Sequence, residues 1–342
     1  MPGHAALDRI LALLVVALVS TGIASLWAGR AADAWVFVLH GVLAAMLAVA
    51  VAVKVRRSVP RAARAGRPGR LALGLAVTAA AAGALTAGYL WVAAGTLVWL
   101  DVPSLGRWTV LTLHAWIGLV LVPLVALHLL PTRLRLLRPR IDRGPGGLRI
   151  SRRTALGAGA LASIGAAAWA GGIVVERLRG GATRFTGSRW LPDGSLPIPT
   201  TFLGEPLPAV DAARWQLAVE RGDELVASFD LARLRALGTV ETTAVLDCTS
   251  GWAVECRWRG VSLAAVLASA GLPVIPDDAR VEVRSITGWS TTLAAPDARR
   301  ALLAWEVEGE PLPIANGAPI RLVAPDRRGL EWVKWVGRIR LG

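Results

Sequence analysis

Five long apolar runs fill the first 175 residues of this 342-residue chain. Each run approaches or exceeds the roughly 20 residues that an α-helix needs to cross the hydrocarbon core of a bilayer. Tryptophans lie near the ends of several runs, as is typical of membrane–water interfaces. We therefore predict five transmembrane helices rather than the buried helices of a soluble domain. The runs cover residues 7–27, 34–53, 71–100, 110–130 and 155–175.

The distribution of charge predicts how these helices are oriented. A net charge of +14 would suit a nucleic-acid-binding protein, but the basic residues gather in the connections 54–70 and 131–153. The connections 28–33 and 101–107 are nearly balanced in charge. Basic short loops stay in the cytoplasm, so we predict an N-terminus inside and a C-terminal domain outside the cytoplasm, in the plasma membrane of a bacterium. Membrane lipid, and no nucleic acid, is the partner that this pattern implies.

Three of the four histidines, His40, His114 and His128, lie inside predicted spans. An ionisable group in a bilayer is costly and indicates a functional site, although a neutral histidine bonded to a neighbouring helix is the alternative. His40 and His114 each lie about six residues, or ~9 Å, from the outer ends of their spans. Two imidazoles at one depth can bind one b-type haem from opposite faces. Gly41 and Gly118 are expected to leave room for the macrocycle.

His128 raises the question of a second haem. It follows His114 by fourteen residues, which is close to four helical turns or ~21 Å along the same side of a helix. That spacing resembles the two-haem helices of membrane b-type cytochromes. The position fourteen residues after His40 is Lys54, however, and His4 lies before the first span. We predict one haem b on the outer side, with a second at His128 left open.

The C-terminal half places a cysteine on a predicted turn. A β-rich run at 242–246 precedes Cys248, and an apolar-periodic helix is predicted at 261–270. A thiolate at such a strand-to-turn junction can bind a soft or high-valent metal. The alternative is a small buried cysteine that packs like alanine.

Cys248, Trp252, Trp258 and Gly260 form a spaced motif in the C-terminal half. Their spacing resembles that around the molybdenum-binding cysteine in the periplasmic methionine-sulfoxide reductase branch of the sulfite oxidase superfamily of molybdopterin enzymes. The resemblance covers residues 184–342. The resemblance implies a mixed α/β molybdopterin-binding domain that moves an oxygen atom to or from a substrate in a two-electron step. Further matching segments lie at 302–306, 309–313, 316–321 and 332–335.

The same resemblance implies roles for individual residues. Cys248 would be the molybdenum ligand and the catalytic residue, and Arg321 and Lys334, on two neighbouring strands, would bind the pterin and its phosphate. A phosphate dianion suits a guanidinium fork and an ammonium group. The other cofactor-binding residues that the resemblance implies are Asn316, Ser285, Val333, Trp332 and Thr200.

Departures from the sulfite oxidases bear on the substrate. The single tyrosine, Tyr89, lies in a predicted span, so the domain lacks the tyrosine of those active sites, and Trp289 occupies that neighbourhood. Ser250, Gly251 and Trp252 replace the basic residues that help those enzymes to bind sulfite. A site lined by Trp252 and Trp289 favours a small neutral S- or N-oxide over sulfite.

The second cysteine, Cys256, has two interpretations. Both cysteines would face an oxidising compartment, where paired thiols often form disulfides. A Cys248–Cys256 bridge is therefore one alternative. The other is a free Cys256 that is small and buried.

The segment Ser151-Arg152-Arg153, directly before the fifth run, resembles a twin-arginine export signal. That route moves folded domains, which suits a domain that takes up a cofactor made in the cytoplasm. We predict a haem-binding four-helix membrane domain at 1–130 and a molybdopterin-binding domain outside the cytoplasm at 184–342. Residues 131–183 would hold the basic cytoplasmic loop, the signal and the fifth helix.

These observations predict a membrane all-α bundle of five transmembrane helices followed by a mixed α/β domain. The predicted function is a membrane-anchored molybdenum oxidoreductase that exchanges electrons through haem b with the quinone pool. The alternative is a non-catalytic binding or sensory protein with a degenerate pterin-binding fold, but the presence of Cys248, Arg321 and Lys334 together favours the enzyme. A transporter is disfavoured because the runs lack pairs of helices broken by Gly or Pro.

Overall fold

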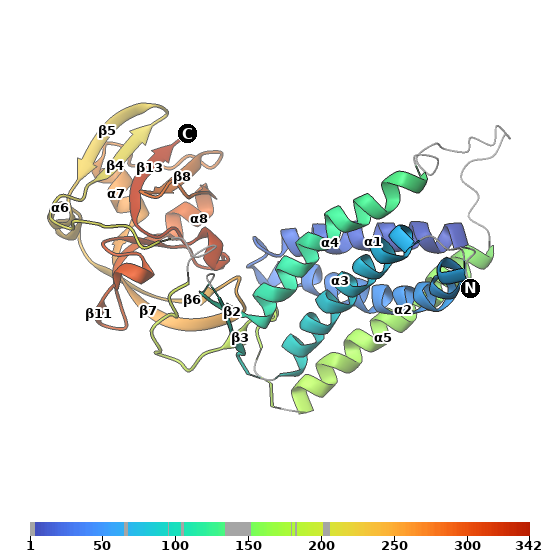
Figure 1. Cartoon of the computed structure of the whole chain (residues 1–342). Coiled ribbons are helices and arrows are strands. Elements are labelled where there is room, and N and C mark those ends of the chain that lie inside the picture. The colour runs from blue at the N-terminus through green and yellow to red at the C-terminus, as the bar shows by residue number, and fades with distance from the viewer. Residues whose placement is uncertain are drawn as a thin grey trace. The chain divides into compact units, whose positions relative to one another are not determined.

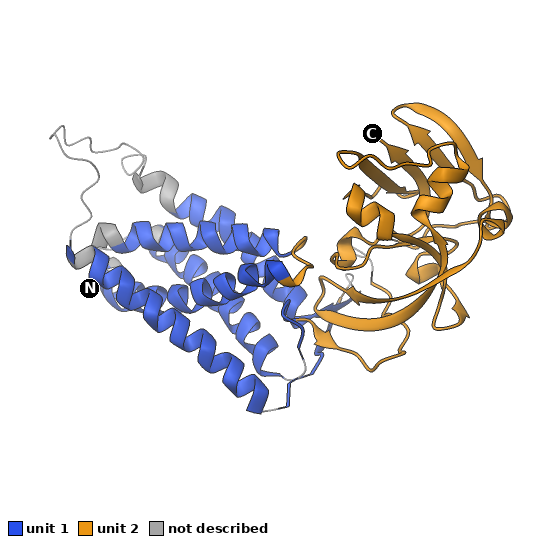
Figure 2. Cartoon of the chain, turned by 180° about the vertical axis from the view of Figure 1, so that it is seen from behind, with its two compact units in different colours: residues 1–25, 32–102, 107–187 blue, residues 26–31, 103–106, 188–342 orange. Residues whose placement is uncertain are grey.

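The computed structural model describes residues 4–64, 68–94, 96–103, 106–133, 152–178, 180–181, 183–200 and 206–342. The chain divides into two compact units (Figure 2). The first unit comprises residues 1–25, 32–102 and 107–187. The second comprises residues 188–342 together with two short segments from the helical half, 26–31 and 103–106.

The first unit is helical (Figure 1). Among the described residues, five helices of this unit are long and apolar enough to cross a membrane, judged by length and composition. A short 3-10 helix, η1 (Ala31–Asp33), precedes the second of them. The five are α1 (His4–Ala24), α2 (Ala34–Arg64), α3 (Pro68–Ala93), α4 (Val110–Arg133) and α5 (Arg152–Leu178).

The third apolar run forms a shorter helix than the sequence predicts. Helix α3 ends at Ala93, and the remainder of the run contributes strand β1 (Trp99–Val102), which pairs with β2 (Gly106–Thr109). Aromatic and β-branched residues such as Val98, Trp99 and Val102 favour extended structure. The apolar run therefore continues past the end of the helix without continuing the helix itself.

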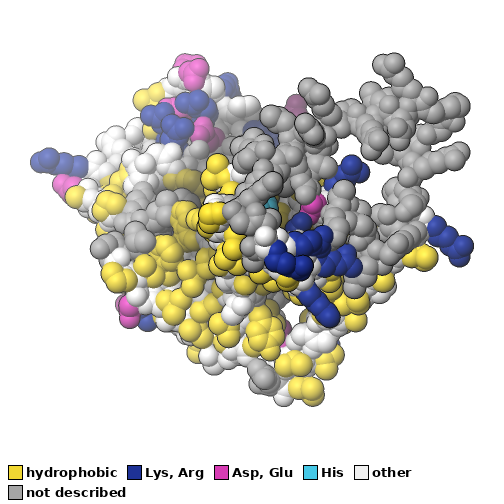
Figure 3. All heavy atoms as spheres, turned by 45° about the vertical axis from the view of Figure 1, so that its right-hand side comes forward, with side chains coloured by type: hydrophobic (Ala, Val, Ile, Leu, Met, Phe, Trp, Pro, Cys, Tyr) yellow, Lys and Arg dark blue, Asp and Glu magenta, His cyan; other side chains and the backbone are white. Residues whose placement is uncertain are grey.

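Large apolar side chains cover much of the surface of the helices. Leu13, Val16, Tyr89, Val120 and Leu127 are each more than half exposed, and apolar side chains dominate much of the face shown in Figure 3. Such extensive exposed apolar surface is typical of contact with a membrane or with another protein.

The second unit is a mixed α/β domain built on two sheets. The first sheet has the order β11-β10-β7-β3, and two more strands pair with it, β12 with β10 and β6 with β7. The second sheet has the order β5-β4-β13-β8-β9. The strands of the first sheet are β3 (Arg189–Trp190), β6 (Val240–Asp247), β7 (Trp252–Ser262), β10 (Leu302–Val307), β11 (Glu310–Pro311) and β12 (Arg321–Val323). Those of the second are β4 (Leu217–Arg221), β5 (Glu224–Phe229), β8 (Arg280–Ser285), β9 (Ser290–Ala294) and β13 (Val336–Leu341).

Short helices connect these strands. They are α6 (Leu231–Ala236), α7 (Leu263–Ser269) and α8 (Ala295–Arg300), with the 3-10 helices η3 (Ile314–Asn316) and η4 (Gly329–Glu331). The helix predicted at 261–270 is α7, and it begins two residues later than predicted. Val261 and Ser262 still pair with β10 at the end of β7, and the Ser262 hydroxyl caps α7 by accepting a hydrogen bond from the Ala265 N–H.

Strand β7 is the central strand of the first sheet, and its sequence alternates accordingly. Cys256, Trp258 and Gly260 are buried, whereas Arg257 and Arg259 between them are exposed, because successive side chains in a strand point to opposite faces. Gly260 has a further role. A Cβ atom at this position would lie 2.0 Å from the Leu303 carbonyl oxygen of β10, so only glycine permits the two strands to approach this closely.

Candidate functional site

Cys248 lies on the tight turn between β6 and β7. Its N–H donates to the Trp252 carbonyl oxygen at 2.8 Å, and the Gly251 N–H donates to its own carbonyl oxygen at 3.0 Å. Gly251 has a φ of 102°, a left-handed conformation that glycine adopts without strain. In the described part of the chain, the thiol contacts two hydroxyls, Ser250 Oγ at 3.0 Å and Thr200 Oγ1 at 3.5 Å. The turn thus holds the sulfur between neutral hydroxyl groups.

Trp252 was predicted to line the substrate site, and this prediction is wrong. Its side chain is 1% exposed, since it starts β7 and the Arg189–Trp190 strand pairs with it in parallel. The indole supports the Cys248 turn from within the core and does not reach a surface that a substrate could touch. Trp289 is about half exposed, but its indole N–H donates to the Leu330 carbonyl oxygen.

A buried ion pair fixes the residue that precedes Cys248. Asp247 Oδ1 accepts from Arg328 Nη1 at 2.5 Å and from Ser188 Oγ at 2.6 Å, and the side chains of Asp247 and Arg328 are 0% and 4% exposed. Sequence analysis missed this pair. The signal that could have found it is the position of Asp247, an acidic residue directly after the apolar segment Ala244-Val245-Leu246 and next to the predicted metal ligand.

Arg321, at the start of β12, is a buried positive charge. Its Nη1 donates to the Asn316 carbonyl oxygen at 2.8 Å, and its guanidinium lies 5.7 Å and 5.9 Å from the ring centres of Trp258 and Trp332. Within the described residues, Nε has no hydrogen-bond partner and no carboxylate lies within 4.0 Å of the guanidinium. Burial lowers the pKa of Arg321 to about 10, while nearby Cys248 raises it, so the group is still a cation at neutral pH. A buried cation without a carboxylate partner is suited to binding an anion.

Lys334 connects Thr200, whose hydroxyl contacts the Cys248 sulfur, to η3 before β12. Its Nζ donates to the Thr200 and Ala315 carbonyl oxygens, both at 2.7 Å. Arg321 and Lys334 were predicted to lie on two neighbouring strands. Arg321 does lie on a strand, β12, but Lys334 lies in the irregular segment between η4 and β13. The Leu322 N–H donates to the Val333 carbonyl oxygen at 2.8 Å, which holds this irregular segment beside β12.

Most of the other predicted cofactor residues surround Arg321 and Lys334. Asn316 is buried and its Nδ2 donates to the Pro197 carbonyl oxygen at 2.9 Å. The ring of Trp332 packs edge-on against Trp258 with centroids 5.4 Å apart. Ser285 is different, because its hydroxyl bonds with Thr287 Oγ1 at 3.0 Å at the end of β8 and is not among the described contacts of the Cys248 sulfur.

Cys256 is a free, buried thiol, as is Cys248. The alternative of a Cys248–Cys256 disulfide is therefore wrong; Cys256 lies in the middle of β7, where it is paired with Ala244 of β6. Its Sγ donates to the Ser195 carbonyl oxygen at 3.3 Å. Burial, with Glu308 nearby, raises the pKa of Cys256 to about 12. The thiol therefore stays protonated at neutral pH and is a poor metal ligand.

The helical unit brings His40 of α2 and His114 of α4 together. Their ring centroids lie 6.0 Å apart with the planes at 80°. His114 Nδ1 lies 2.8 Å from the Ala84 carbonyl oxygen, so Nδ1 carries the proton. His40 Nδ1 lies 2.8 Å from Thr21 Oγ1, whose hydroxyl donates to the Ala17 carbonyl oxygen at 2.8 Å and can therefore accept from the ring. In both rings this leaves the Nε2 lone pair for a metal.

Space beside the two histidine rings comes from Gly88 and Gly22, which were not among the predicted glycines. A Cβ atom at Gly41 would lie 2.3 Å from Cδ1 of Trp169, so Gly41 admits this indole of α5 and was wrongly predicted to make room for a macrocycle. A Cβ at Gly118 would meet nothing within 4 Å. Gly88 of α3 and Gly22 of α1 lie beside the rings, because a Cβ there would lie 3.1 Å from His114 Nδ1 and 3.6 Å from His40 Cε1.

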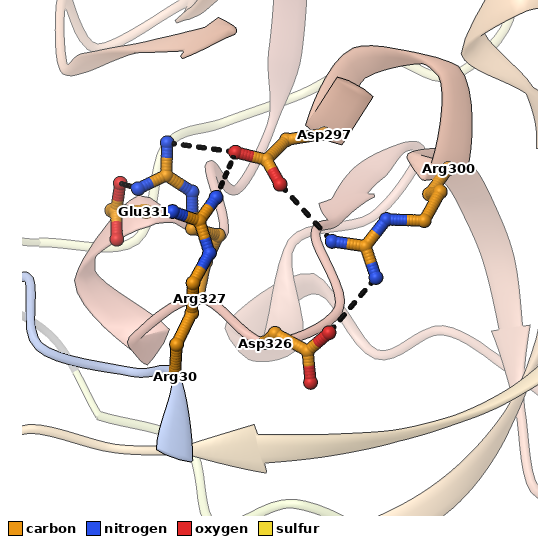
Figure 4. A network of polar contacts seen from close by, with 6 residues as sticks. All are labelled: Arg30, Asp297, Arg300, Asp326, Arg327 and Glu331. Carbon is orange, nitrogen blue, oxygen red and sulfur yellow. Dashed lines mark hydrogen bonds and ion pairs between the residues drawn. The ribbon is translucent and has the colours of Figure 1, made fainter. Parts of the chain in front are cut away.

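Another polar network in the second unit is centred on Asp297 (Figure 4). This 3% exposed residue accepts from Arg30 at 2.6 Å, Arg300 at 3.0 Å and Arg327 at 3.2 Å. Arg30 belongs to the segment 26–31, which is part of this unit. Although burial raises the pKa of Asp297, the arginines outweigh it and hold that pKa below its ordinary value. The network fixes the 26–31 segment against the loop that leads to Arg328.

Comparison with known proteins identifies the second unit. Residues 204–342 match the family model of the oxidoreductase molybdopterin binding domain. This is a molybdopterin-binding domain of the sulfite oxidase type. The mitochondrial sulfite oxidase of Mus musculus is 33% identical over 117 residues, which cover 31% of this chain and 21% of that protein. The match confirms the mixed α/β molybdopterin-binding domain that the sequence predicts.

Bacterial proteins are similar to the same domain. The protein-methionine-sulfoxide reductase catalytic subunit of Gluconobacter oxydans is 30% identical over 125 residues, which cover 32% of this chain and 40% of that protein. An uncharacterised oxidoreductase of Bacillus subtilis, YuiH, is 28% identical over 133 residues, covering 38% of this chain and 66% of that protein. The chain thus spans about a fifth of the length of the first relatives, and the similarity concerns the molybdopterin-binding domain.

The residues of the molybdopterin-binding domain fit the cofactor that its family binds. The Arg321 guanidinium lacks a carboxylate in the described part of the chain, and the Cys248 sulfur is held on a tight turn within reach of Thr200. Lys334 bonds to the carbonyl oxygen of that same Thr200. Thr200 therefore links the proposed sulfur ligand to Lys334, one of the two cations suited to an anionic cofactor.

Proposed function

We propose that this protein is a membrane-anchored molybdenum oxidoreductase that transfers an oxygen atom outside the cytoplasm. The observation that carries the proposal is the presence together of Cys248, on its fixed turn, and of the buried Arg321, which has no carboxylate within 4.0 Å among the described residues. When bound, the molybdenum cofactor supplies a two-electron oxygen-atom transfer. The residues of the chain bind and orient it: Cys248 as thiolate ligand, and Arg321 and Lys334 as charges for its anionic groups.

A small neutral S- or N-oxide is the substrate class that we propose. The sulfur of Cys248 is neighboured by the hydroxyls of Thr200 and Ser250, and neither of these carries a charge that would attract sulfite. The similarity to a methionine-sulfoxide reductase subunit supports the reductive direction. Hydroxyl groups can orient a neutral oxide by hydrogen bonding without requiring the substrate to be an anion.

We further propose that His40 and His114 bind one haem b in the helical unit, through which electrons exchange with membrane quinone. Metal–nitrogen bonds to imidazole are about 2 Å long, so two rings that share one metal ion keep centres several ångströms apart, and the 6.0 Å between these rings is compatible with this. Both Nδ1 atoms are engaged with oxygen atoms, which is the arrangement typical of ligating histidines. A haem supplies one-electron transfer when bound.

The five apolar helices support the anchoring part of the proposal. With five crossings, the N-terminus and the molybdopterin-binding domain lie on opposite sides of the membrane. The basic connections 54–70 and 131–153 then face the cytoplasm and the domain lies outside it.

Metal analysis of purified wild type and Cys248→Ser tests the proposed activity. We expect about one molybdenum per chain in the wild type, with reduction of a small sulfoxide by reduced viologen dye. Cys248→Ser should lose at least 10³-fold of this activity, since it removes the proposed ligand, while its near-UV circular dichroism stays unchanged. Cys256→Ala is the matched control, because the protonated and buried Cys256 thiol has no proposed contact with the cofactor. Molybdenum-free but active wild type, or full activity in Cys248→Ser, contradicts the proposal.

A further inference from the structure

The hairpin turn between β8 and β9 carries two exposed apolar side chains. Ile286 is 47% and Trp289 is 45% exposed. The turn is closed by the Ser285 N–H, which donates to the Trp289 carbonyl oxygen at 2.7 Å, and by the Gly288 N–H, which donates to the Ser285 carbonyl oxygen at 3.1 Å. Gly288 has a φ of 96°, a conformation that glycine adopts without strain. The turn therefore presents both apolar side chains from a fixed backbone.

The same turn is held to both ends of the segment 330–335, which includes three of the predicted cofactor residues. The Ile286 N–H donates to the Trp335 carbonyl oxygen at 2.9 Å. At the other end of the segment, the Trp289 indole N–H donates to the Leu330 carbonyl oxygen at 3.0 Å. These two hydrogen bonds fix the hairpin turn beside the part of the chain that is predicted to bind the cofactor.

The start of this segment also lies against the turn that presents the proposed sulfur ligand. A Cβ atom at Gly329 would lie 3.2 Å from the Cys248 Cα atom, so the two backbones are in close contact. Leu330, whose carbonyl oxygen holds the Trp289 indole, is the next residue, and consecutive Cα atoms are about 3.8 Å apart. A single residue of backbone therefore separates the contact with Cys248 from the contact with Trp289.

A half-exposed indole whose N–H is already bonded is suited to binding an apolar group. Tryptophan is enriched among the residues that contribute most to binding, because its ring buries a large apolar area and prefers defined geometries. The hydrogen bond to Leu330 fixes the ring before a ligand arrives, which lowers the entropy cost of binding. Ile286 adds aliphatic surface from the same turn, and neither side chain carries a charge.

We propose that Trp289 and Ile286 are specificity-determining residues that bind the apolar substituent of an oxide whose oxygen is removed beside Cys248. This inference rests on the proposed function and narrows its substrate class to neutral oxides that carry an aryl or a branched alkyl group. Dimethyl sulfoxide, with two methyl groups, lacks such a substituent. In each case two electrons and two protons convert the sulfoxide to a sulfide and water, and a reduced viologen dye supplies the electrons in the assay.

The ratio of kcat/KM for methyl p-tolyl sulfoxide to that for dimethyl sulfoxide tests the proposal. We expect the wild type to favour the aryl sulfoxide by about tenfold or more, as differences of this size in an apolar contact allow. Trp289→Ala should lose most of this preference through a higher KM for the aryl sulfoxide, whereas Trp289→Phe, which keeps an aromatic ring, should retain most of it. Leu225→Ser is the matched control, because Leu225 is 60% exposed on β5 at the opposite edge of the same sheet and should behave as the wild type does.

A second variant guards against misfolding of Trp289→Ala. Ile286→Ser removes the other exposed apolar side chain of the turn and should also lower the ratio. The molybdenum content and the near-UV circular dichroism of each variant check that the domain is assembled.

Photolabelling locates the apolar substituent without requiring turnover. Full-length protein is irradiated with a benzophenone that carries a methylsulfinyl group, and labelled peptides are mapped by mass spectrometry. We expect the label within residues 286–289 or 330–335, and excess methyl p-tolyl sulfoxide should compete with it more strongly than dimethyl sulfoxide does. In Trp289→Ala the labelling of these residues should fall, and in Leu225→Ser it should match the wild type.

Three results would overturn the inference. They are a wild type without preference for the aryl sulfoxide, a preference that is equal in wild type and Trp289→Ala, and a label confined to other parts of the domain. Failure of the proposed function looks different, because molybdenum-loaded wild type then reduces neither sulfoxide. In that case the photolabel still decides whether the β8–β9 turn binds an aryl sulfoxide.

Discussion

Arg328 Nη1 lies 2.5 Å from Asp247 Oδ1, and Asp247 is the residue directly before Cys248. Eighty-one positions separate these two residues in sequence, and the contact joins the end of β6 to the loop before η4. A Cβ atom at Gly329 would lie 3.0 Å from the Asp247 carbonyl oxygen, so the backbones also approach closely here. The ion pair therefore sets the position from which the Cys248 turn starts.

Asp247→Asn should destabilise the domain and weaken its hold on the cofactor. Removing one partner of a buried ion pair costs about 3–5 kcal/mol, because the other charge stays buried without compensation. We expect a lower thermal unfolding midpoint and a reduced molybdenum content in the purified protein. Arg214→Gln is the matched control: the Arg214–Asp211 pair is exposed, with the arginine side chain 90% accessible, and such pairs contribute about 1 kcal/mol or less. Equal effects of the two substitutions would contradict the role given to Asp247.

The Asp297 network predicts a loss of stability in acid. The pKa of Asp297 lies below its ordinary value of 3.8, since contacts with Arg30, Arg327 and Arg300 outweigh the effect of burial. A carboxyl with a lowered pKa in the folded state stabilises the fold above its unfolded pKa and loses that contribution as the pH falls through the folded value. We therefore expect Asp297→Asn to be less stable than wild type at pH 7, and the difference to shrink below pH ~4. A difference that is constant across this range would exclude the ion pairs as its source.

Glu331 provides the opposite case in the same network. Burial raises its pKa above the ordinary value of 4.5, although Arg327 lowers it. A raised carboxyl pKa contributes stability that is complete below the unfolded pKa and is lost as the pH rises through the folded value. Glu331→Gln should therefore flatten the decline in stability above pH ~4.5. Thermal unfolding of wild type and Glu331→Gln at a series of pH values measures this.

One haem b per chain is expected from the pyridine haemochrome assay. Replacing either His40 or His114 by Ala should remove it, and His128→Gln should retain it. Thr21→Val is a milder variant, because it removes the hydroxyl that bonds to His40 Nδ1; loss of such a partner weakens metal-site affinity by about 10–100-fold. Haem loss in the His128 variant, or retention in both of the others, would place the haem elsewhere.

Export of the molybdopterin-binding domain should depend on Arg152 and Arg153 together. Their replacement by Lys should leave the domain in the cytoplasm, because twin-arginine signals discriminate strongly between the two cations. Arg177→Lys, at the other end of α5, is the matched control and should be exported. Protease accessibility in spheroplasts distinguishes these outcomes. Ser151 and most of the preceding basic connection lie outside the described residues, so this prediction comes from the sequence.

Features that depend on neighbouring residues were predictable from the sequence. The apolar runs predicted helices that the structure confirms, because the length and hydropathy of a helix are properties of a continuous segment. The turn that presents Cys248 was predictable for a related reason. Ser250 and Gly251 follow the β-rich run directly, so the residues that end the strand are its own neighbours in the sequence. The equal depth of His40 and His114 followed from simple counting along two helices, and the structure places their rings together.

Contacts between distant segments were decided by the tertiary structure alone. The sequence offers many arginines as partners for each acid, and only packing selects Arg328 for Asp247, Arg30 for Asp297 and Lys54 for Asp8. Two further outcomes depended on which elements pack together. Trp252 is buried although an exposed side chain was expected, and the space beside Gly41 is occupied by Trp169. Hydropathy and periodicity act within a segment, whereas the cost of burying a charge depends on partners that only the folded chain brings near.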